Sequence, residues 1–247
     1  MYRVLFQWRG IRIHSYPAML YFGLVAGVIA GTYSASLHGL NSARVYTAII
    51  LLIVPALMGS RLLFVASHWE SFRRQPRRIF SRSEGGAMLY GGLALSLALS
   101  VPLLRSLGVS FPGFWDAATI TILVGMIPVK IGCLLNGCCS GRPSDGIFSI
   151  FAPNENGVWR RRVPSQLLEA GLAVVLLIVS YSLRARVPHE GVLFLTAAAG
   201  YGSARWWLLC NRDSTVRIGA VNVQLMISGA LAAFSAMSLL LIWLNNS

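Results

Sequence analysis

The sequence predicts an all-α protein that crosses a membrane seven times and forms a single domain. Of its 247 residues, 55% are hydrophobic and 12% are charged, whereas about 25% of the residues in a soluble domain carry a charge. Seven apolar stretches also reach the roughly 20 residues that a helix needs to span a bilayer. They cover residues 17–37, 45–67, 85–104, 117–141, 165–183, 191–209 and 220–244. The loops between them are too short to hold a second domain.

Residues 1–16 precede the first span and combine aromatic with basic side chains. These side chains are Tyr2, Phe6, Trp8, Arg3, Arg9 and Arg12. Such a mixture is typical of a segment that lies at the membrane interface. No short apolar core with a small-residue cleavage site precedes the first span, so we expect no removable signal peptide.

The ionisable residues inside the predicted spans share one side of the membrane. If successive spans alternate in direction, spans two, four and six end on the face that carries the N-terminus, here called face A. The ionisable residues are Arg61, Lys130, Glu169 and Arg205, and all lie in the half of the membrane next to face A. Such residues usually face a protein interior or a wet cavity. We therefore predict a central polar, lipid-accessible cavity near face A, with excess positive charge for an anionic ligand.

Further polar residues fall on the same face. They are Tyr16, Asn136, Arg142, Gln166 and Arg212. The alternative interpretation is that long basic side chains near helix ends reach out to lipid headgroups without any function. That alternative accounts for a single arginine more readily than for the whole set.

The fourth span carries small and polar residues around its lysine. At helical spacing, Lys130, Cys133, Gly137 and Gly141 form one stripe, and Gly132, Asn136 and Ser140 form another. Small residues allow helices to approach closely, and Pro128 is expected to loosen the helix just before the lysine. A packing seam alone would explain the glycines but not Lys130.

Two span entrances are also informative. Four glycines surround Tyr90 in the stretch EGGAMLYGGLA, which allows irregular backbone or the close approach of a ligand. The stretch RVPSQLLEAG opens the fifth span with Pro164 and Ser165, a favourable helix start, and places Gln166 and Glu169 one turn apart.

Charge and cysteine content limit the partners. The net charge of +13 comes almost wholly from arginine, because Lys130 is the only lysine. Arginine forms bidentate contacts with phosphates, so we expect membrane lipid headgroups as partners; a compositional habit of the genome is the alternative. No soluble domain is left to bind nucleic acid. Because adjacent cysteines are rarely good ligands together and no histidine is near in sequence, we interpret Cys133, Cys138 and Cys139 as packing residues and expect no metal.

Seven short motifs, in order along nearly the whole chain, resemble those of the bacterial prolipoprotein diacylglyceryl transferases. They read HSYPAML, GSRLLFV, GGAMLYGG, KIGCLLNGCCSGR, RVPSQLLEA, YGSARWWLLCNRD and QLMIS. The fourth and fifth, for example, are similar to the family patterns R-x-G-N-F-x-N-G-E-x-x-G-R and R-H-P-S-Q-L-Y-E. No motif is decisive alone, but their order and their positions in the spans make the resemblance specific.

The resemblance implies a seven-span enzyme of the bacterial plasma (inner) membrane that needs no cofactor. Such an enzyme moves the diacylglyceryl group of phosphatidylglycerol to the thiol of a lipobox cysteine in a prolipoprotein and releases glycerol phosphate. By motif, Lys130 and Arg205 would hold the phosphate. The residues expected to form the substrate site around them are Tyr16, Arg61, Asn136, Gly141, Arg142, Gln166, Glu169, Tyr201 and Arg212.

The sequence departs from the family motifs at several positions. Tyr90 stands where the family has histidine, and Lys130 where it has arginine. Cys133, Cys138 and Leu209 replace an asparagine and two glutamates. Tyr90 and His14, which lies where the family also has histidine, are the candidates for activating the thiol. These departures leave two alternatives open: a transferase of the same scaffold with another acceptor, and a non-catalytic phospholipid-binding or transport protein.

Orientation is predicted in opposite ways by charge and by resemblance. Outside the spans, face A carries many arginines and face B carries four, namely Arg44, Arg105, Arg184 and Arg186. The positive-inside rule would therefore make face A cytoplasmic. The resemblance implies that face A is periplasmic or extracellular. We follow the resemblance, because arginines that bind anionic lipid would raise the count on whichever face holds the site.

Overall fold

Seven long helices form the body of the molecule. The structure is a computed structural model that describes residues 4–8, 11–74, 76–80, 88–154, 157–184, 186, 189–210, 217–218 and 221–246. In these residues the long helices are α1 (Ser15–Leu37), α2 (Ser42–Ser67), α4 (Leu89–Leu107), α5 (Phe111–Asn136), α6 (Ser165–Arg184), α7 (Val192–Cys210) and α8 (Val223–Asn246). Short helical turns, α3 (Trp69–Phe72) and η1 (Pro76–Phe80), follow α2.

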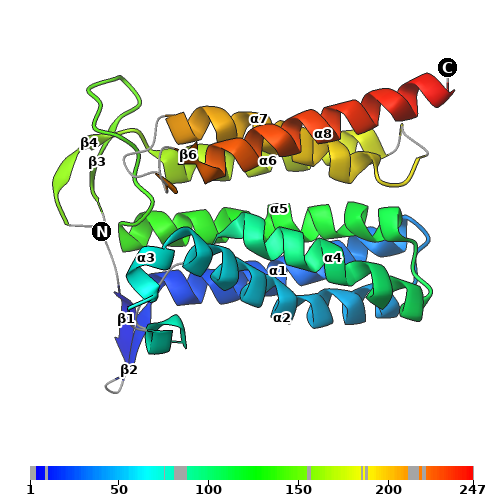
Figure 1. Ribbon diagram of the computed structural model, residues 1–247, viewed down its shortest axis with the longest axis horizontal. Helices are drawn as coiled ribbons and strands as arrows, with labels where there is room; N and C mark the ends of the chain where they lie inside the picture. The colour runs from blue at the N-terminus through cyan, green and yellow to red at the C-terminus, as the bar shows by residue number, and fades with distance from the viewer. Residues whose placement is uncertain are drawn as a thin grey trace.

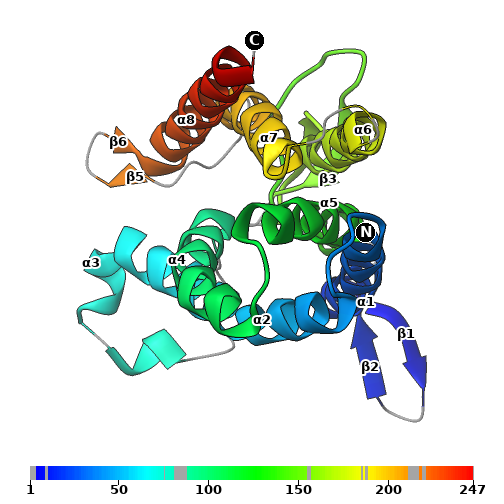
Figure 2. The same ribbon diagram turned by 90° about the vertical axis from the view of Figure 1, so that its right-hand side faces the viewer.

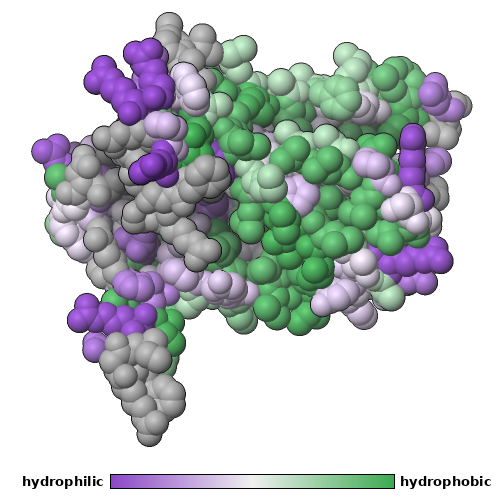
Figure 3. Space-filling view, turned by 60° about the horizontal axis from the view of Figure 1, so that its bottom comes forward, coloured by the Kyte–Doolittle hydropathy of each residue, from purple (hydrophilic) through white to green (hydrophobic). Residues whose placement is uncertain are grey.

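Six of these helices, all but α7, are long and apolar enough to cross a membrane. Figure 3 shows hydrophobic side chains across the middle of one face and hydrophilic ones toward its two ends. A helical chain of this kind is a multi-pass membrane protein, as the sequence predicted. The remaining helix, α7, carries Tyr201 and Arg205 in its second half, and its predicted crossing stays a prediction.

The helices form two groups that meet at α5. Helices α1, α2, α4 and α5 lie together, and α6, α7 and α8 lie beside them (Figures 1 and 2). Helix α5 contacts α1 and α4 in its own group and α6 and α7 in the other. Successive long helices alternate in direction, so that the ends of α5 and α7 and the starts of α1 and α6 lie at the left-hand end of Figure 1. This end is face A.

Glycines let α1 and α5 pack with their backbones close together. Gly23, Gly27 and Gly31 repeat every four residues along α1 and face α5. A Cβ atom on Gly27 would lie 2.5 Å from the carbonyl oxygen of Thr121. Small residues at such contacts are typical of helices that associate within a membrane, where van der Waals packing replaces the hydrophobic driving force.

A buried carboxylate attaches α7 to α5 at the end opposite face A. The two oxygens of Asp116 accept hydrogen bonds from the backbone nitrogens of Gly191 at 2.7 Å and Phe194 at 2.8 Å. These are among the N–H groups at the start of a helix that have no partner within the helix itself. Asp116 therefore fixes where α7 begins. Its role was not predicted, because Asp116 lies one residue before the predicted fourth span.

Helix α5 ends earlier than predicted. It stops at Asn136, and Gly137 has a left-handed backbone with φ 76°. The predicted stripes through Gly137, Ser140 and Gly141 are therefore wrong, because these residues lie in the following loop. Pro128 lies inside α5, which continues through it. The helix of the third span begins at Leu89, and residues 85–87 of that prediction lie outside the described residues.

The described residues include three small antiparallel hairpins that the all-α prediction did not contain. They pair β1 (Val4–Trp8) with β2 (Ile11–His14), β3 (Ile150–Pro153) with β4 (Trp159–Arg162), and β5 (Arg217–Ile218) with β6 (Val221–Asn222). All three lie at face A (Figures 1 and 2). Strands this short carry too few residues for their alternation to be recognised in the sequence.

Candidate functional site

Three ionisable side chains from three helices meet near face A. The carboxylate of Glu169 on α6 forms ion pairs with Lys130 Nζ on α5 through Oε2 and with Arg205 Nη1 on α7 through Oε1. The Glu169 side chain is 2% exposed, and those of Lys130 and Arg205 are 14% and 11% exposed. A buried charge is costly unless it is paired, so one carboxylate between two cations explains how both persist at membrane depth.

The ionic group keeps a net positive charge and a free donor. Two cations and one carboxylate leave a net charge of +1. Among the described residues, the buried Nε of Arg205 has no hydrogen-bond partner. A buried donor without a partner is uncommon in proteins, and it offers a hydrogen bond to an anionic ligand.

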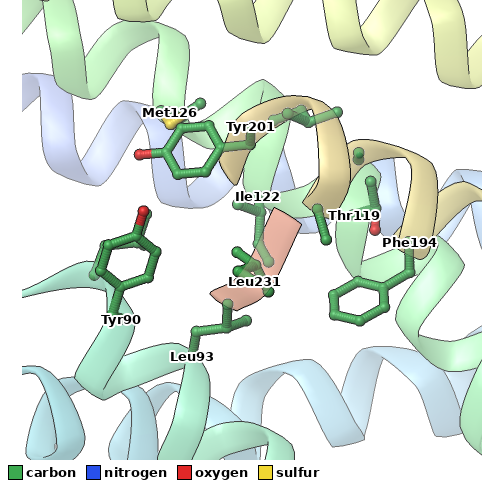
Figure 4. Close-up of a pocket in the computed structure, with 12 residues that line it drawn as sticks. Tyr90, Leu93, Thr119, Ile122, Met126, Phe194, Tyr201 and Leu231 are labelled. Carbon is green, nitrogen blue, oxygen red and sulfur yellow. The ribbon is translucent and has the colours of Figure 1, made fainter. Parts of the chain in front are cut away.

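A narrow cavity of about 60 Å³ adjoins this group between α4, α5, α7 and α8 (Figure 4). Its lining is mainly apolar, with Leu93, Phe194 and Leu231 among the lining residues. The hydroxyl groups of Tyr90 and Tyr201 point to the same side of it (Figure 4). This space offers hydroxyl groups in an otherwise apolar wall, and the predicted central polar cavity stays a prediction.

Tyr90 links the cavity to the ionic group. Its hydroxyl shares a 2.6 Å hydrogen bond with Ser228 Oγ on α8, and both residues are buried. Tyr90 also interacts electrostatically with Tyr201, Arg205 and Glu169. Helices from both groups therefore contribute to one site. Sequence analysis overlooked Ser228, although it closes the motif QLMIS.

The loop after α5 folds against the start of α6. Gln166 Nε2 donates a 2.6 Å hydrogen bond to the carbonyl oxygen of Cys138, and the backbone nitrogen of Gly141 donates to that of Val163 at 3.2 Å. A Cβ atom on Gly141 would lie 2.6 Å from Ser165 Oγ. Gly141 permits the close approach of the protein's own backbone, and the predicted close approach of a substrate stays a prediction. Arg162, which was not singled out, donates from Nη1 to the Gly141 carbonyl at 3.4 Å.

The three crowded cysteines lie beside this loop. The Sγ atoms of Cys133, Cys138 and Cys139 all lie within 4.8 Å of one another. Tyr16 interacts electrostatically with these thiols and with Lys130, so it belongs to the same region. Hydrogen bonding with Cys133 lowers the pKa of the Cys138 thiol. Hydrogen bonding with Cys139 and burial raise this pKa and together outweigh the lowering, so the net shift is upward.

Other predicted site residues have different surroundings. Arg61 donates from Nε to the carbonyl of Ile79 at 3.1 Å, and its guanidinium lies 5.5 Å and 5.6 Å from the ring centroids of Phe64 and Phe72. These contacts attach the α3–η1 segment to α2. His14, at the end of β2, and Arg142 are exposed, whereas Asn136 is half-buried as the last residue of α5. Arg212 lies outside the described residues.

Comparison with known proteins assigns the chain to a family. The family model for prolipoprotein diacylglyceryl transferases matches residues 3–243. The chain belongs to the prolipoprotein diacylglyceryl transferase family. It is 28% identical over 220 residues to the phosphatidylglycerol–prolipoprotein diacylglyceryl transferase of Geobacter sulfurreducens, a match that covers 87% of this chain and 84% of that protein.

Two further transferases of the family show the same level of similarity. The one from Methylococcus capsulatus is 28% identical over 85% of this chain and 81% of its own length. Transferase 2 of Clostridium perfringens is 26% identical over 60% of this chain, a match that spans 57% of that relative's length. Membership in the transferase family agrees with the resemblance of the motifs, although at modest identity.

Three residues that were interpreted as departures from the family motifs lie in the packed interior. Leu209 is 2% exposed, and Cys133 and Tyr90 are also buried. Tyr90 is held by its hydrogen bond with Ser228. That these residues replace other groups of the family motifs stays a prediction.

Proposed function

We propose that the protein transfers the diacylglyceryl group of phosphatidylglycerol to the thiol of a lipobox cysteine and releases glycerol phosphate. The observation that carries this proposal is the convergence of Lys130 and Arg205 on Glu169, with Arg205 Nε left without a partner among the described residues. The phosphodiester of phosphatidylglycerol carries one negative charge, which matches the +1 of the ionic group. Family membership supports the same substrates.

The chemical step is a substitution at the glyceryl carbon. The thiol sulfur forms a bond to this carbon while the bond from the carbon to the phosphate oxygen breaks, and the electron pair leaves with the phosphate. Charge therefore grows on the phosphate in the transition state. Lys130 and Arg205, fixed in advance by Glu169, would stabilise that charge without having to reorganise.

The thiol proton needs a path to the leaving group. An ordinary tyrosine has a pKa of about 10 and keeps its proton near neutral pH, so it cannot accept the thiol proton as a histidine with a pKa near 6.5 can. The Tyr90 hydroxyl can instead act as a relay: it gives its proton to the departing phosphate oxygen and takes the thiol proton. Tyr90 is then unchanged at the end of the step. Its bond to Ser228 supports this role by fixing the direction of the hydroxyl.

In the membrane, we propose that all seven long helices cross and that face A lies outside the cytoplasm of a bacterial cell, in its plasma membrane. The lipobox peptide would then meet the lipid at the end where α5, α6 and α7 bring their charges together. Tyr16, Asn136 and Tyr201 would shape that site, and Arg142 would contact lipid headgroups at its rim.

The proposal is tested with purified protein, phosphatidylglycerol labelled in the glyceryl group and a lipobox peptide. We expect label on the peptide and release of glycerol phosphate. Tyr90→Phe should lower the rate more than His14→Ala, because the His14 ring is exposed at the end of β2 whereas Tyr90 is buried at the cavity. Intact phosphatidylglycerol after binding would contradict transfer and favour a lipid-binding or transport protein.

A second candidate function is transfer from phosphatidylglycerol to a different acceptor. It is favoured by the packing of Leu209 and Cys133 at positions where the motifs carry an acid and an amide. The same assay separates the two: release of glycerol phosphate without labelling of the lipobox peptide would favour another acceptor. Rescue of lipoprotein modification in cells depleted of their own transferase would favour the first.

A further inference from the structure

The cysteine cluster is built by the way α5 ends. The backbone nitrogen of Gly137 donates to the carbonyl of Leu134, and that of Cys138 donates to the carbonyl of Cys133, both at 3.1 Å. With the left-handed Gly137 between them, these bonds form a Schellman motif, which brings the side chains of its first and last residues into contact. The two residues here are Cys133 and Cys138. Their Sγ atoms therefore meet because of the helix end, not by chance.

An unusual backbone brings in the third thiol. Adjacent side chains in extended chain point in opposite directions, which is why two neighbouring cysteines rarely ligate together. Cys139 has φ 61°, and it is the only non-glycine residue with positive φ in the described part of the chain. This conformation turns its Sγ back toward the other two. This backbone conformation is unfavourable for a residue other than glycine. Residues held in it concentrate at functional sites such as ligand clamps.

We propose that Cys133, Cys138 and Cys139 bind one thiophilic metal ion, with Cu⁺ preferred over Zn²⁺. Three metal–sulfur bonds of about 2.3 Å require sulfur atoms about 4 Å apart, so the observed limit of 4.8 Å needs only a small closure. Thiolates select Cu⁺ and Zn²⁺ among cellular ions. A structural zinc site takes four protein ligands, whereas the described cluster offers three sulfurs and no histidine or carboxylate. Cu⁺ accepts three.

Metal binding would connect the candidate site to its supporting loop. Cys133 lies one turn after Lys130 on α5, and Gln166 attaches the carbonyl of Cys138 to α6. A bound ion would hold the end of α5 and this loop in one arrangement. This inference does not depend on the transferase activity, because it rests on the thiols and the backbone alone.

The test uses the full chain, purified in detergent and reduced without oxygen. It is titrated with Cu⁺ against bicinchoninate and, separately, with Zn²⁺ against a coloured chelator. We expect one Cu⁺ per chain and a raised thermal midpoint. Cys133→Ser and Cys138→Ser should each weaken Cu⁺ binding by more than about 100-fold, a larger loss than that of a residue that only orients a ligand. Cys210→Ser is the matched control and should change nothing, since Cys210 is exposed at the end of α7.

Cys139→Gly separates metal binding from a merely structural role. Glycine adopts positive φ without strain, so this variant should raise the thermal midpoint of the metal-free chain while it weakens Cu⁺ binding. Unchanged Cu⁺ stoichiometry and affinity in Cys133→Ser and Cys139→Gly would overturn the proposal. It would also be overturned if chain isolated without reductant had two of these thiols joined in a disulfide. Tighter binding of Zn²⁺ than of Cu⁺ would overturn the stated preference.

Discussion

At the residue scale, the site depends on one carboxylate that serves two cations. The sequence predicted that Lys130, Glu169 and Arg205 lie in the half of the membrane next to face A, because position along each span indicates the half in which a residue lies. It could not predict that Glu169 bridges the other two, since that depends on how α5, α6 and α7 are rotated about their axes. The same uncertainty about helix rotation applies to Arg61. It lies in the same half of the membrane as the ionic group, but its side chain contacts the Ile79 carbonyl and two phenylalanine rings.

Removal of the shared carboxylate should destabilise the protein. Glu169→Gln leaves two buried cations without their partner, and breaking a buried pair in this way costs about 3–5 kcal/mol. Thermal unfolding in detergent measures the effect. Glu70→Gln is the control, because the pair between Glu70 and Arg73 is exposed and such pairs contribute about 0–1 kcal/mol. Equal midpoints for the two variants would show that the Glu169 pairs contribute little.

The charge of Lys130 should matter more than its shape. Lys130→Gln is expected to lower kcat/KM for diacylglyceryl transfer by about 100-fold or more, the effect of losing one fixed donor to a developing charge. Lys130→Arg keeps the charge and introduces the fork found in the family motif, so it should retain most of the activity. Arg61→Gln serves as the control for loss of an arginine near the same face. If it were as damaging as Lys130→Gln, the ionic group would not be the phosphate site.

At the scale of elements, helix existence could be predicted but helix ends could not. Apolar length identified all seven long helices. The end of α5 was missed because the apolar stretch continues through Gly137, and only the left-handed φ of that glycine stops the helix. Asp116 was missed for a related reason: a charge at a predicted span boundary looks like a loop residue, whereas it caps α7.

The close contact of α1 with α5 should tolerate no side chain on its glycines. Gly27→Ala places a Cβ atom 2.5 Å from the backbone oxygen of Thr121, so the helices must move apart. We expect a loss of about 1–3 kcal/mol in the free energy of unfolding, the usual cost of overpacking. Gly171→Ala on α6 is the matched control: its Cβ atom meets nothing within 4 Å and alanine favours the helix. Reversible unfolding in mixed micelles compares the two.

At the scale of the whole molecule, the site lies where the two helix groups meet. Tyr90 and Lys130 come from one group, and Glu169, Arg205 and Ser228 from the other. The sequence predicted that the charged residues share face A, since the helices alternate in direction. It could not predict which helices pack together. The helices are similarly apolar on every side, so the sequence does not indicate which surface of one helix contacts another helix distant in sequence. A small shift between the groups would therefore separate Lys130 from Glu169 and Tyr90 from Ser228.

Charge and the resemblance of the motifs predict opposite membrane orientations, and the orientation can be measured directly. Arg162 belongs to the arginines of face A but is 2% exposed and bonds the Gly141 carbonyl, so its charge is engaged within the protein. At least this arginine of face A has a structural role within the protein, which weakens the argument from the arginine count.

We therefore expect face A to be accessible from outside the cell. In a Cys210→Ser background, Asp145→Cys in the exposed loop before β3 should react with a membrane-impermeant maleimide in intact cells. His189→Cys, exposed between α6 and α7 at the opposite end, should react only after the membrane is permeabilised. The parent with its three clustered cysteines gives the baseline. The reverse pattern would place the ionic group beside the cytoplasm, where a lipobox peptide that has crossed the membrane could not reach it, and transfer to exported prolipoproteins would then be ruled out.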